Sequence, residues 1–175
     1  MQRLAAQMTE LSCPKGTCLL RAGKVERSVF FVRKGIVRAY LEDEGRQITF
    51  WIGAEGSTVV SLKSYVHGQP GYESAECMED CSFYVLRRAA LEDLFREDIE
   101  IANWGRKFAE SELLKAEEKF IPLLFTTASE RYEALLKNSP ELLQRLPLEC
   151  LASYLGVTAQ SLSRIRAGLK QGSGD

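Results

Sequence analysis

The sequence predicts an α+β fold: an N-terminal β-roll of the jelly-roll type, a long connecting helix, and an all-α C-terminal domain with a helix-turn-helix. The first half contains short runs of β-branched and aromatic residues separated by glycines, a pattern typical of antiparallel sheets. Helical patterns begin near Arg88 and continue to the end of the chain. We therefore expect the roll in residues 1–97, the connecting helix in 98–120 and the helix-turn-helix domain in 121–175.

Each strand of the expected roll is a short apolar run with a glycine at or near its ends. The pairs Lys34-Gly35 and Glu44-Gly45 are typical of hairpin turns, because the glycine tolerates a positive φ. The expected strands are Thr17–Leu20, Val29–Arg33, Ile36–Leu41, Gln47–Ile52, Thr58–Leu62 and Ser82–Leu86.

The connecting helix has one apolar stripe at its start, because Ile101, Trp104 and Phe108 recur at three-four spacing. This stripe suits packing against the roll or against a second copy of the chain. Polar residues at Ser111 and Lys115 interrupt it, so a continuous coiled coil is not supported.

Two start signals mark the helices that follow. Thr127 and Glu130 have the spacing of a capping box, which would open a helix over residues 131–137. The Ser139-Pro140 pair would start another short helix, since proline suits the first helical turn.

The segment 148–166 has the pattern of a helix-turn-helix. Gly156 falls where the first helix must end with a positive φ, and the Thr158 hydroxyl can cap the second helix. The apolar positions fall where the two helices would touch, namely Leu151, Leu155, Val157, Leu162 and Ile165.

The other face of the second helix would present groups that contact DNA bases and phosphates. Arginine pairs with guanine edges, glutamine with adenine, and hydroxyls with phosphate oxygens. The expected contact residues are Thr158, Ala159, Gln160, Ser161, Arg164, Arg166 and Lys170. A plain helical hairpin with a solvated charged face is the alternative.

The charge distribution supports binding of double-stranded DNA through this end of the molecule. The chain of 175 residues has a formal net charge of −1, so it is not attracted to DNA as a whole. Residues 144–171 nevertheless carry four cations and only one carboxylate.

The chain has no apolar run long enough to span a bilayer, and its first ten residues lack the apolar core of a signal peptide. We therefore expect a cytoplasmic protein without a membrane partner.

Metal, cofactor and catalytic sites are not expected. A jelly-roll metalloenzyme needs two or three converging histidines, and His67 is the only histidine of the chain. No nucleophile, base and oxyanion hole can be identified, so the chain is not expected to be an enzyme. The cysteines Cys13, Cys18, Cys77 and Cys81 are too widely spaced for a dense cluster motif, and buried structural thiols are favoured over redox or metal sensing.

The order of roll, long helix and helix-turn-helix resembles the cyclic-AMP receptor protein and fumarate-nitrate regulator family of bacterial transcription factors. The resemblance covers nearly the whole chain, and the segments 130–132 and 151–166 are similar to the branch common in Bacteroidetes. It implies a homodimer that binds near-palindromic operators and recruits RNA polymerase, with a small-molecule effector in the roll. By this resemblance, Ile101, Trp104 and Phe108 would lie in the dimer helix. The segments that carry the resemblance are 15–16, 23, 29–38, 44–46, 56, 130–132, 151–158 and 162–166.

The chain departs from this family at the expected effector pocket. Where cyclic-nucleotide binders have a Gly-Glu pair and an arginine, this chain has Val60-Ser61 and Glu73. A carboxylate in place of the arginine repels a phosphate, so cyclic-nucleotide binding is not expected. The candidate effector-pocket residues are Val60, Ser61, Glu73, Ser74 and Ala75. The alternative function is a ligand-binding or protein-interaction roll whose C-terminal helices do not bind DNA.

Overall fold

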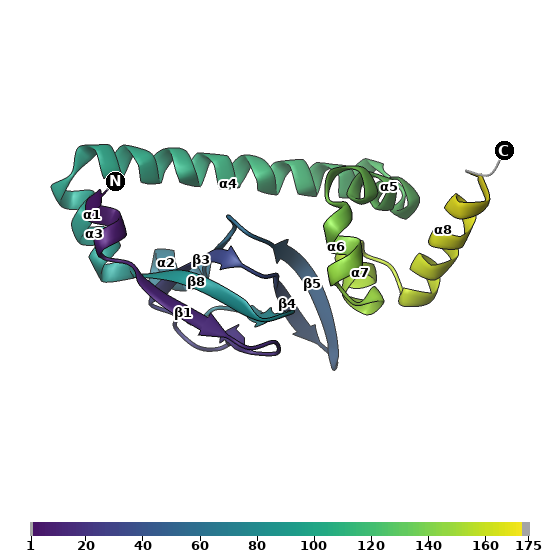
Figure 1. The fold of residues 1–175 in the computed structure, drawn as a ribbon, viewed down its shortest axis with the longest axis horizontal. Helices are drawn as coiled ribbons and strands as arrows, with labels where there is room; N and C mark the ends of the chain where they lie inside the picture. The colour runs from purple at the N-terminus through teal and green to yellow at the C-terminus, as the bar shows by residue number, and fades with distance from the viewer. Residues whose placement is uncertain (1, 173–175) are drawn as a thin grey trace.

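The N-terminal half of the protein is a roll of two four-stranded antiparallel sheets (Figure 1). The computed structural model describes residues 2–172. The strand orders are β1-β8-β3-β6 in one sheet and β2-β7-β4-β5 in the other, which confirms the predicted β-roll. The strands are β1 (Thr9–Cys13), β2 (Cys18–Leu20), β3 (Ser28–Lys34), β4 (Val37–Asp43), β5 (Arg46–Gly53), β6 (Thr58–Val59), β7 (Ser74–Cys77) and β8 (Cys81–Arg87).

Both sheets contribute side chains to one apolar core between them. Phe30 and Phe83 of the first sheet meet edge to face, with their ring centroids 6.1 Å apart. Val37, Ala39 and Ala75 of the second sheet belong to the same buried cluster. Burial of this apolar surface holds the two sheets together.

Only one of the two expected hairpins is present. Glu44 and Gly45 both have a positive φ and join β4 to β5, which pair from Asp43 and Arg46 onward. The Lys34-Gly35 prediction was wrong, because β3 pairs with β6 and β8 while β4 pairs with β5 and β7. Gly35 therefore carries the chain from one sheet to the other. A side chain there would collide with the Cys81 thiol, since an added Cβ would lie 2.5 Å from its sulfur.

Strands β1 and β7 were not predicted from the sequence, and one predicted strand extends over the start of a helix. Strand β1 lies at a sheet edge with four exposed residues, so it lacks the alternating apolar pattern of a half-buried strand. The predicted strand Thr58–Leu62 is correct only for Thr58–Val59. Helix α2 starts at Leu62, and its C-cap Gly68 has a left-handed conformation.

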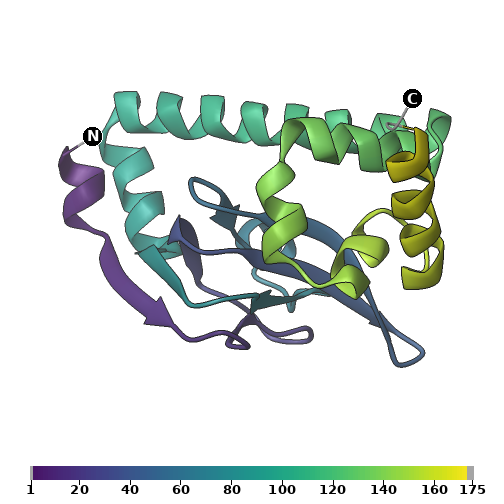
Figure 2. The same ribbon diagram turned by 45° about the vertical axis from the view of Figure 1, so that its right-hand side comes forward.

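A long helix lies along one side of the roll and leads to the C-terminal helices (Figures 1 and 2). This helix, α4, begins after Asp98, whose side chain accepts hydrogen bonds from the amides of Glu100 and Ile101. It packs closely on α3 where Gly105 meets the Phe95 ring. The helices are α1 (Gln2–Ala6), α2 (Leu62–His67), α3 (Arg88–Glu97), α4 (Ile99–Phe125), α5 (Ala128–Asn138), α6 (Pro140–Arg145), α7 (Leu148–Tyr154) and α8 (Ala159–Gly172).

The predicted start signals of α5 and α6 are confirmed. Thr127 and Glu130 form a reciprocal capping box at the start of α5, and Pro140 opens α6. The C-terminal helices share a second buried cluster with Ile36 and Met78 of the roll. Among residues 2–172, no helix is long and apolar enough to cross a membrane.

Candidate nucleic-acid interface

Helices α7 and α8 pack around the turn that the sequence predicted. Gly156 has a φ of +73°, and the amide of Val157 donates to the Ala152 carbonyl at 2.9 Å. The expected apolar contacts are present, because Leu151 and Leu162 are fully buried in the second cluster. Local turn chemistry and apolar burial therefore hold α8 at a fixed angle to α7.

The outer face of α8 presents most of the predicted DNA-contact residues to solvent. Thr158 caps the helix, since its hydroxyl oxygen accepts from the Ser161 amide at 3.1 Å. Gln160, Ser161 and Arg164 are exposed, and Arg166 is half-buried. The prediction that Ala159 lies on this outer face is wrong. Ala159 is half-buried and packs against the second cluster, because the first turn of α8 contacts α7. The side chain of Lys170 lies outside the described residues.

Neither arginine of this face has a carboxylate partner in the part of the chain that the structure describes. Among residues 2–172, Arg164 and Arg166 make no ion pair with a carboxylate. Arg131, by contrast, supports the turn by donating to the Leu155 carbonyl at 3.0 Å. Two unpaired guanidinium groups on a solvent-facing helix can bind phosphates or guanine edges.

Helix α7 is docked on strand β5 of the roll (Figure 2). The Ser153 hydroxyl donates to the Gln47 carbonyl at 3.0 Å and accepts from the Thr49 amide at 2.8 Å. One serine side chain therefore satisfies a backbone carbonyl and a backbone amide of β5. This contact is one of those that join α7 to the roll.

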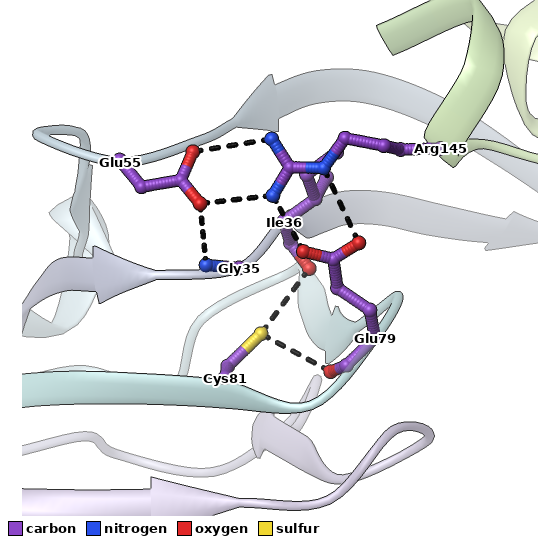
Figure 3. A network of polar contacts seen from close by, with 6 residues as sticks. All are labelled: Gly35, Ile36, Glu55, Glu79, Cys81 and Arg145. Atoms are coloured by element: carbon purple, nitrogen blue, oxygen red, sulfur yellow. Dashed lines mark hydrogen bonds and ion pairs between the residues drawn. The ribbon is translucent and has the colours of Figure 1, made fainter. Parts of the chain in front are cut away.

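A second polar contact ties α6 to the roll. The Arg145 guanidinium donates to both oxygens of Glu55 at 2.9 and 3.2 Å and also pairs with Glu79 (Figure 3). Hydrogen bonding to Arg145 lowers the pKa of the Glu55 carboxyl to about 2. From the sequence, Arg145 is only one cation of the basic end of the chain, because its carboxylate partners are 66 and 90 residues away. We refer to Arg145, Glu55 and Glu79 as the clasp.

Lys119 of α4 joins three elements beside this docking surface. Its ammonium donates to the Phe50 carbonyl of β5 and lies 3.8 Å from the ring centroid of Tyr154 at the end of α7. Removal of the ammonium from water lowers its pKa to about 8.

We expect Lys119 to make the stability of the protein depend on pH. Above pH 8 the folded protein releases a proton that the unfolded chain keeps until about pH 10.5, so stability rises with pH in this interval. Between pH 7.5 and 9.5 the wild type should gain about 1–2 kcal/mol in unfolding free energy relative to the Lys119→Met variant. Urea unfolding at both pH values measures this difference. If the difference in unfolding free energy between the wild type and the variant does not change with pH, the prediction is contradicted.

The first two residues of the predicted dimer stripe, Ile101 and Trp104, pack against the protein's own N-terminal half. Ile101 is only 1% exposed and belongs to a buried cluster with Val29 and Leu86, so it cannot contact a second copy. Trp104 packs partly against the same cluster and stacks on Phe108 at 5.6 Å between ring centroids. The prediction that Ile101 lies in a dimer interface is therefore wrong. The three-four spacing identifies an apolar face but not the surface that covers it.

The exposed apolar surface of α4 lies nearer its C-terminal end. Residues four and seven positions apart there share one face of the helix and remain open to solvent. They are Leu113, Leu114, Phe120, Ile121, Leu124 and Phe125.

The predicted effector residues do not surround one common cavity. Ala75 faces the apolar core between the sheets, whereas Ser74 lines a shallow hollow on the outside of the second sheet. Ser61 and Glu73 are buried and meet at Gly71, where an added Cβ would lie 2.4 Å from Ser61 Oγ and 3.1 Å from Glu73 Oε1. Val60 packs against the cluster that contains Ile101. A carboxylate therefore occupies the position at which the resemblance placed a phosphate-binding arginine.

Cys13, Cys77, Cys81 and Cys150 are buried, whereas Cys18 is half-buried and its thiol donates to the Leu20 carbonyl at 2.8 Å, so the prediction of a buried thiol is wrong for Cys18. Cys13, Cys77 and Cys81 lie together in the core between the sheets, and Cys150 lies in the second cluster. Burial raises the pKa of each of these thiols, so they remain protonated. Among the residues described, no group of histidine, cysteine and acidic side chains could hold a metal ion.

Comparisons with known proteins agree with the fold. The family model described as cyclic nucleotide-binding domain matches residues 10–98, about half of the chain. FixK2 from Bradyrhizobium japonicum is 25% identical and superposes with a TM-score of 0.79, covering 95% of this chain and 86% of FixK2. A comparison with curated protein sequences found no match.

Two further solved structures share the fold at lower identity. A CooA variant from Carboxydothermus hydrogenoformans is 22% identical with a TM-score of 0.73, covering 95% of this chain and 78% of CooA. A protein from Eubacterium rectale assigned to the crp/fnr family of transcriptional regulators is 15% identical with a TM-score of 0.76, covering 97% and 81% of the two chains. With its roll matched by the domain model and its full length matched by these structures, the chain belongs to the cyclic nucleotide-binding domain family and has the architecture of a crp/fnr-type regulator.

Proposed function

We propose that the protein is a transcription regulator that binds operator DNA through α8. The proposal rests on the outer face of this helix, which presents Gln160, Ser161 and Arg164 to solvent, with the half-buried Arg166 at its edge. A helix capped by Thr158 and held at a fixed angle by α7 is suited to enter a major groove with its first turns. The structural relatives assigned to transcriptional regulators support this proposal.

The active form is a homodimer joined along the C-terminal half of α4. One recognition helix contacts too few base pairs for selectivity, and two helices ~34 Å apart reach successive major grooves. The exposed apolar face around Leu114 and Ile121 supplies surface for a second copy. Water-exposed apolar side chains on one continuous helix face are typical of such an interface.

The proposal includes two further partners, RNA polymerase and a small-molecule effector. The operator complex would form in the cytoplasm and contact RNA polymerase. The roll would serve as the sensor for a small-molecule effector that is not a cyclic nucleotide.

Selection of duplexes from a random library, followed by fluorescence anisotropy on the selected and a scrambled sequence, tests the DNA-binding function. We expect selected duplexes with two related half-sites, and binding that weakens steeply as salt increases. Equal affinity for the selected and scrambled sequences at every salt concentration would contradict the proposal.

We expect cyclic AMP to leave the melting temperature unchanged at millimolar concentration. A ligand that binds only the folded protein must raise its melting temperature by mass action. The buried Glu73 carboxylate, 5% exposed, opposes a phosphate at this position. Differential scanning fluorimetry with cyclic AMP and cyclic GMP measures the effect, and a saturable shift of several degrees would overturn the prediction.

A further inference from the structure

Three turns of the roll meet at the single guanidinium of Arg145. Glu55 lies in the turn after β5, and Glu79 lies in the turn between β7 and β8. The third turn joins through its backbone, because the Gly35 amide donates at 2.8 Å to the same Glu55 oxygen that Arg145 binds (Figure 3). Glu55 therefore connects the turn between the two sheets with a C-terminal helix.

The clasp is accompanied by apolar contacts from the same turns. Ile36 follows Gly35, and Met78 precedes Glu79. Both side chains are buried in the cluster that holds α5 to α8 together. The Met78 amide also donates to the Ile36 carbonyl at 2.8 Å, so the two turns are linked by their backbones. A shift of either turn would therefore change polar and apolar contacts to the C-terminal helices at once.

The local geometry leaves these turns little freedom. The Gly35 backbone has a φ of +104° and is packed against the Cys81 sulfur. The Cys81 thiol in turn donates to the carbonyls of Glu79 and Ile36 (Figure 3). Thus the acceptors of Arg145 are held on a rigid end of the roll, and the guanidinium adopts the position that they define.

We propose that Arg145 is a positioning residue, which through Glu55 and Glu79 sets the placement of α7 and α8 on the roll and thereby the half-site spacing that the dimer accepts. This inference rests on the proposed DNA-binding function. A guanidinium that pairs with two carboxylates, and with one of them through both oxygens, fixes both the distance and the angle of approach of α6. The clasp thus connects the sensor roll to the DNA-binding helices.

The Arg145→Gln variant tests the docking of α7 through the Thr49 amide. This amide donates to Ser153 of α7, so its hydrogen exchange reports separation of α7 from β5. We expect about tenfold faster exchange at Thr49 in the variant. The Val32 amide, which bonds to the Ser57 carbonyl inside the roll, should not change. Unchanged exchange at Thr49 would overturn the proposal, and this readout requires no DNA.

Operator spacing tests the consequence for DNA recognition. On duplexes whose half-site spacing is changed by one base pair, we expect the variant to discriminate about fivefold less than the wild type while binding a single half-site equally well. Arg145→Lys should restore part of the discrimination, because it keeps the charge without the bidentate geometry. Full discrimination by Arg145→Gln would contradict the positioning role. If the wild type fails to bind any duplex, the proposed function is wrong, whereas Thr49 exchange still tests the clasp.

Two kinds of variant serve as controls. Arg33 pairs with Glu10 at 3.0 Å within the roll, so Arg33→Gln makes the same substitution at an exposed ion pair that does not involve the C-terminal helices. It should change neither Thr49 exchange nor spacing discrimination. If Arg145→Gln does not fold, Glu55→Gln and Glu79→Gln each weaken the clasp from the other side and should give the same two effects. Wild-type behaviour of both glutamate variants would overturn the proposal.

Discussion

Replacing Ile121 by aspartate is expected to convert the dimer into a monomer and to abolish selective operator binding. Ile121 is 51% exposed in the single chain and lies at the centre of the apolar face of α4. In a two-fold interface the substitution places two carboxylates in apolar surroundings, which should weaken dimerisation by about 100-fold or more. Sedimentation equilibrium and anisotropy on the selected operator measure the two effects.

Two other variants show whether this loss is specific to the α4 face. Leu136 of α5 is 44% exposed, and Leu136→Asp introduces the same charge on a leucine outside this face. It should leave the dimer intact. Trp104→Ala should lower the melting temperature without dissociating the dimer, because Trp104 packs against the roll's own cluster. Dimerisation of Ile121→Asp at wild-type affinity would remove this face from the interface.

Replacing Arg164 by alanine should weaken binding to the selected operator by about 1–3 kcal/mol, roughly 5- to 150-fold, with little effect on scrambled DNA. Arg164 lies exposed about one and a half turns after the Thr158 cap, within reach of a guanine edge. Its guanidinium has no carboxylate partner among residues 2–172, so its removal should leave the fold unchanged.

Arg166 provides the contrast for this experiment. It lies at the edge of the exposed face, where phosphate contact is expected. Arg166→Ala should weaken binding to both DNAs about equally and reduce the salt slope by about one. Equal losses on both DNAs for Arg164→Ala would exclude it as a base-contacting residue, and no loss from either variant would contradict DNA binding by α8.

The features that the sequence predicted correctly depend on contacts within a few residues. The positive φ of Gly156, the Thr158 cap and the box of Thr127 and Glu130 each involve neighbours within one turn of helix. Such contacts are decided by glycine conformational freedom and side-chain to backbone hydrogen bonds. The apolar spacing of residues 151–165 predicted the helix packing for the same reason.

The errors occurred where partners are distant in the chain. The spacing of Ile101 identified an apolar face correctly, but only the folded protein shows that its own roll covers this face. Gly35 has the positive φ that its sequence context predicted. The turn nevertheless crosses from one sheet to the other, because the pairing of β3 and β4 is decided by strands distant in the chain. The error at Ala159 is different, because α7 lies close in the chain and the burial of Ala159 depends on how α8 packs on α7.

By itself, the sequence determined the order of roll, long helix and helix pair, and the chemistry of the α8 face, because local propensity and apolar periodicity are properties of short segments. Only the tertiary structure decided which apolar face of α4 is free and where Arg145 finds its partners. Glu55 and Glu79 carry no local signal of this role, since they lie 90 and 66 residues from Arg145 and meet it only where α6 packs on the roll beside the buried Ile36 and Met78.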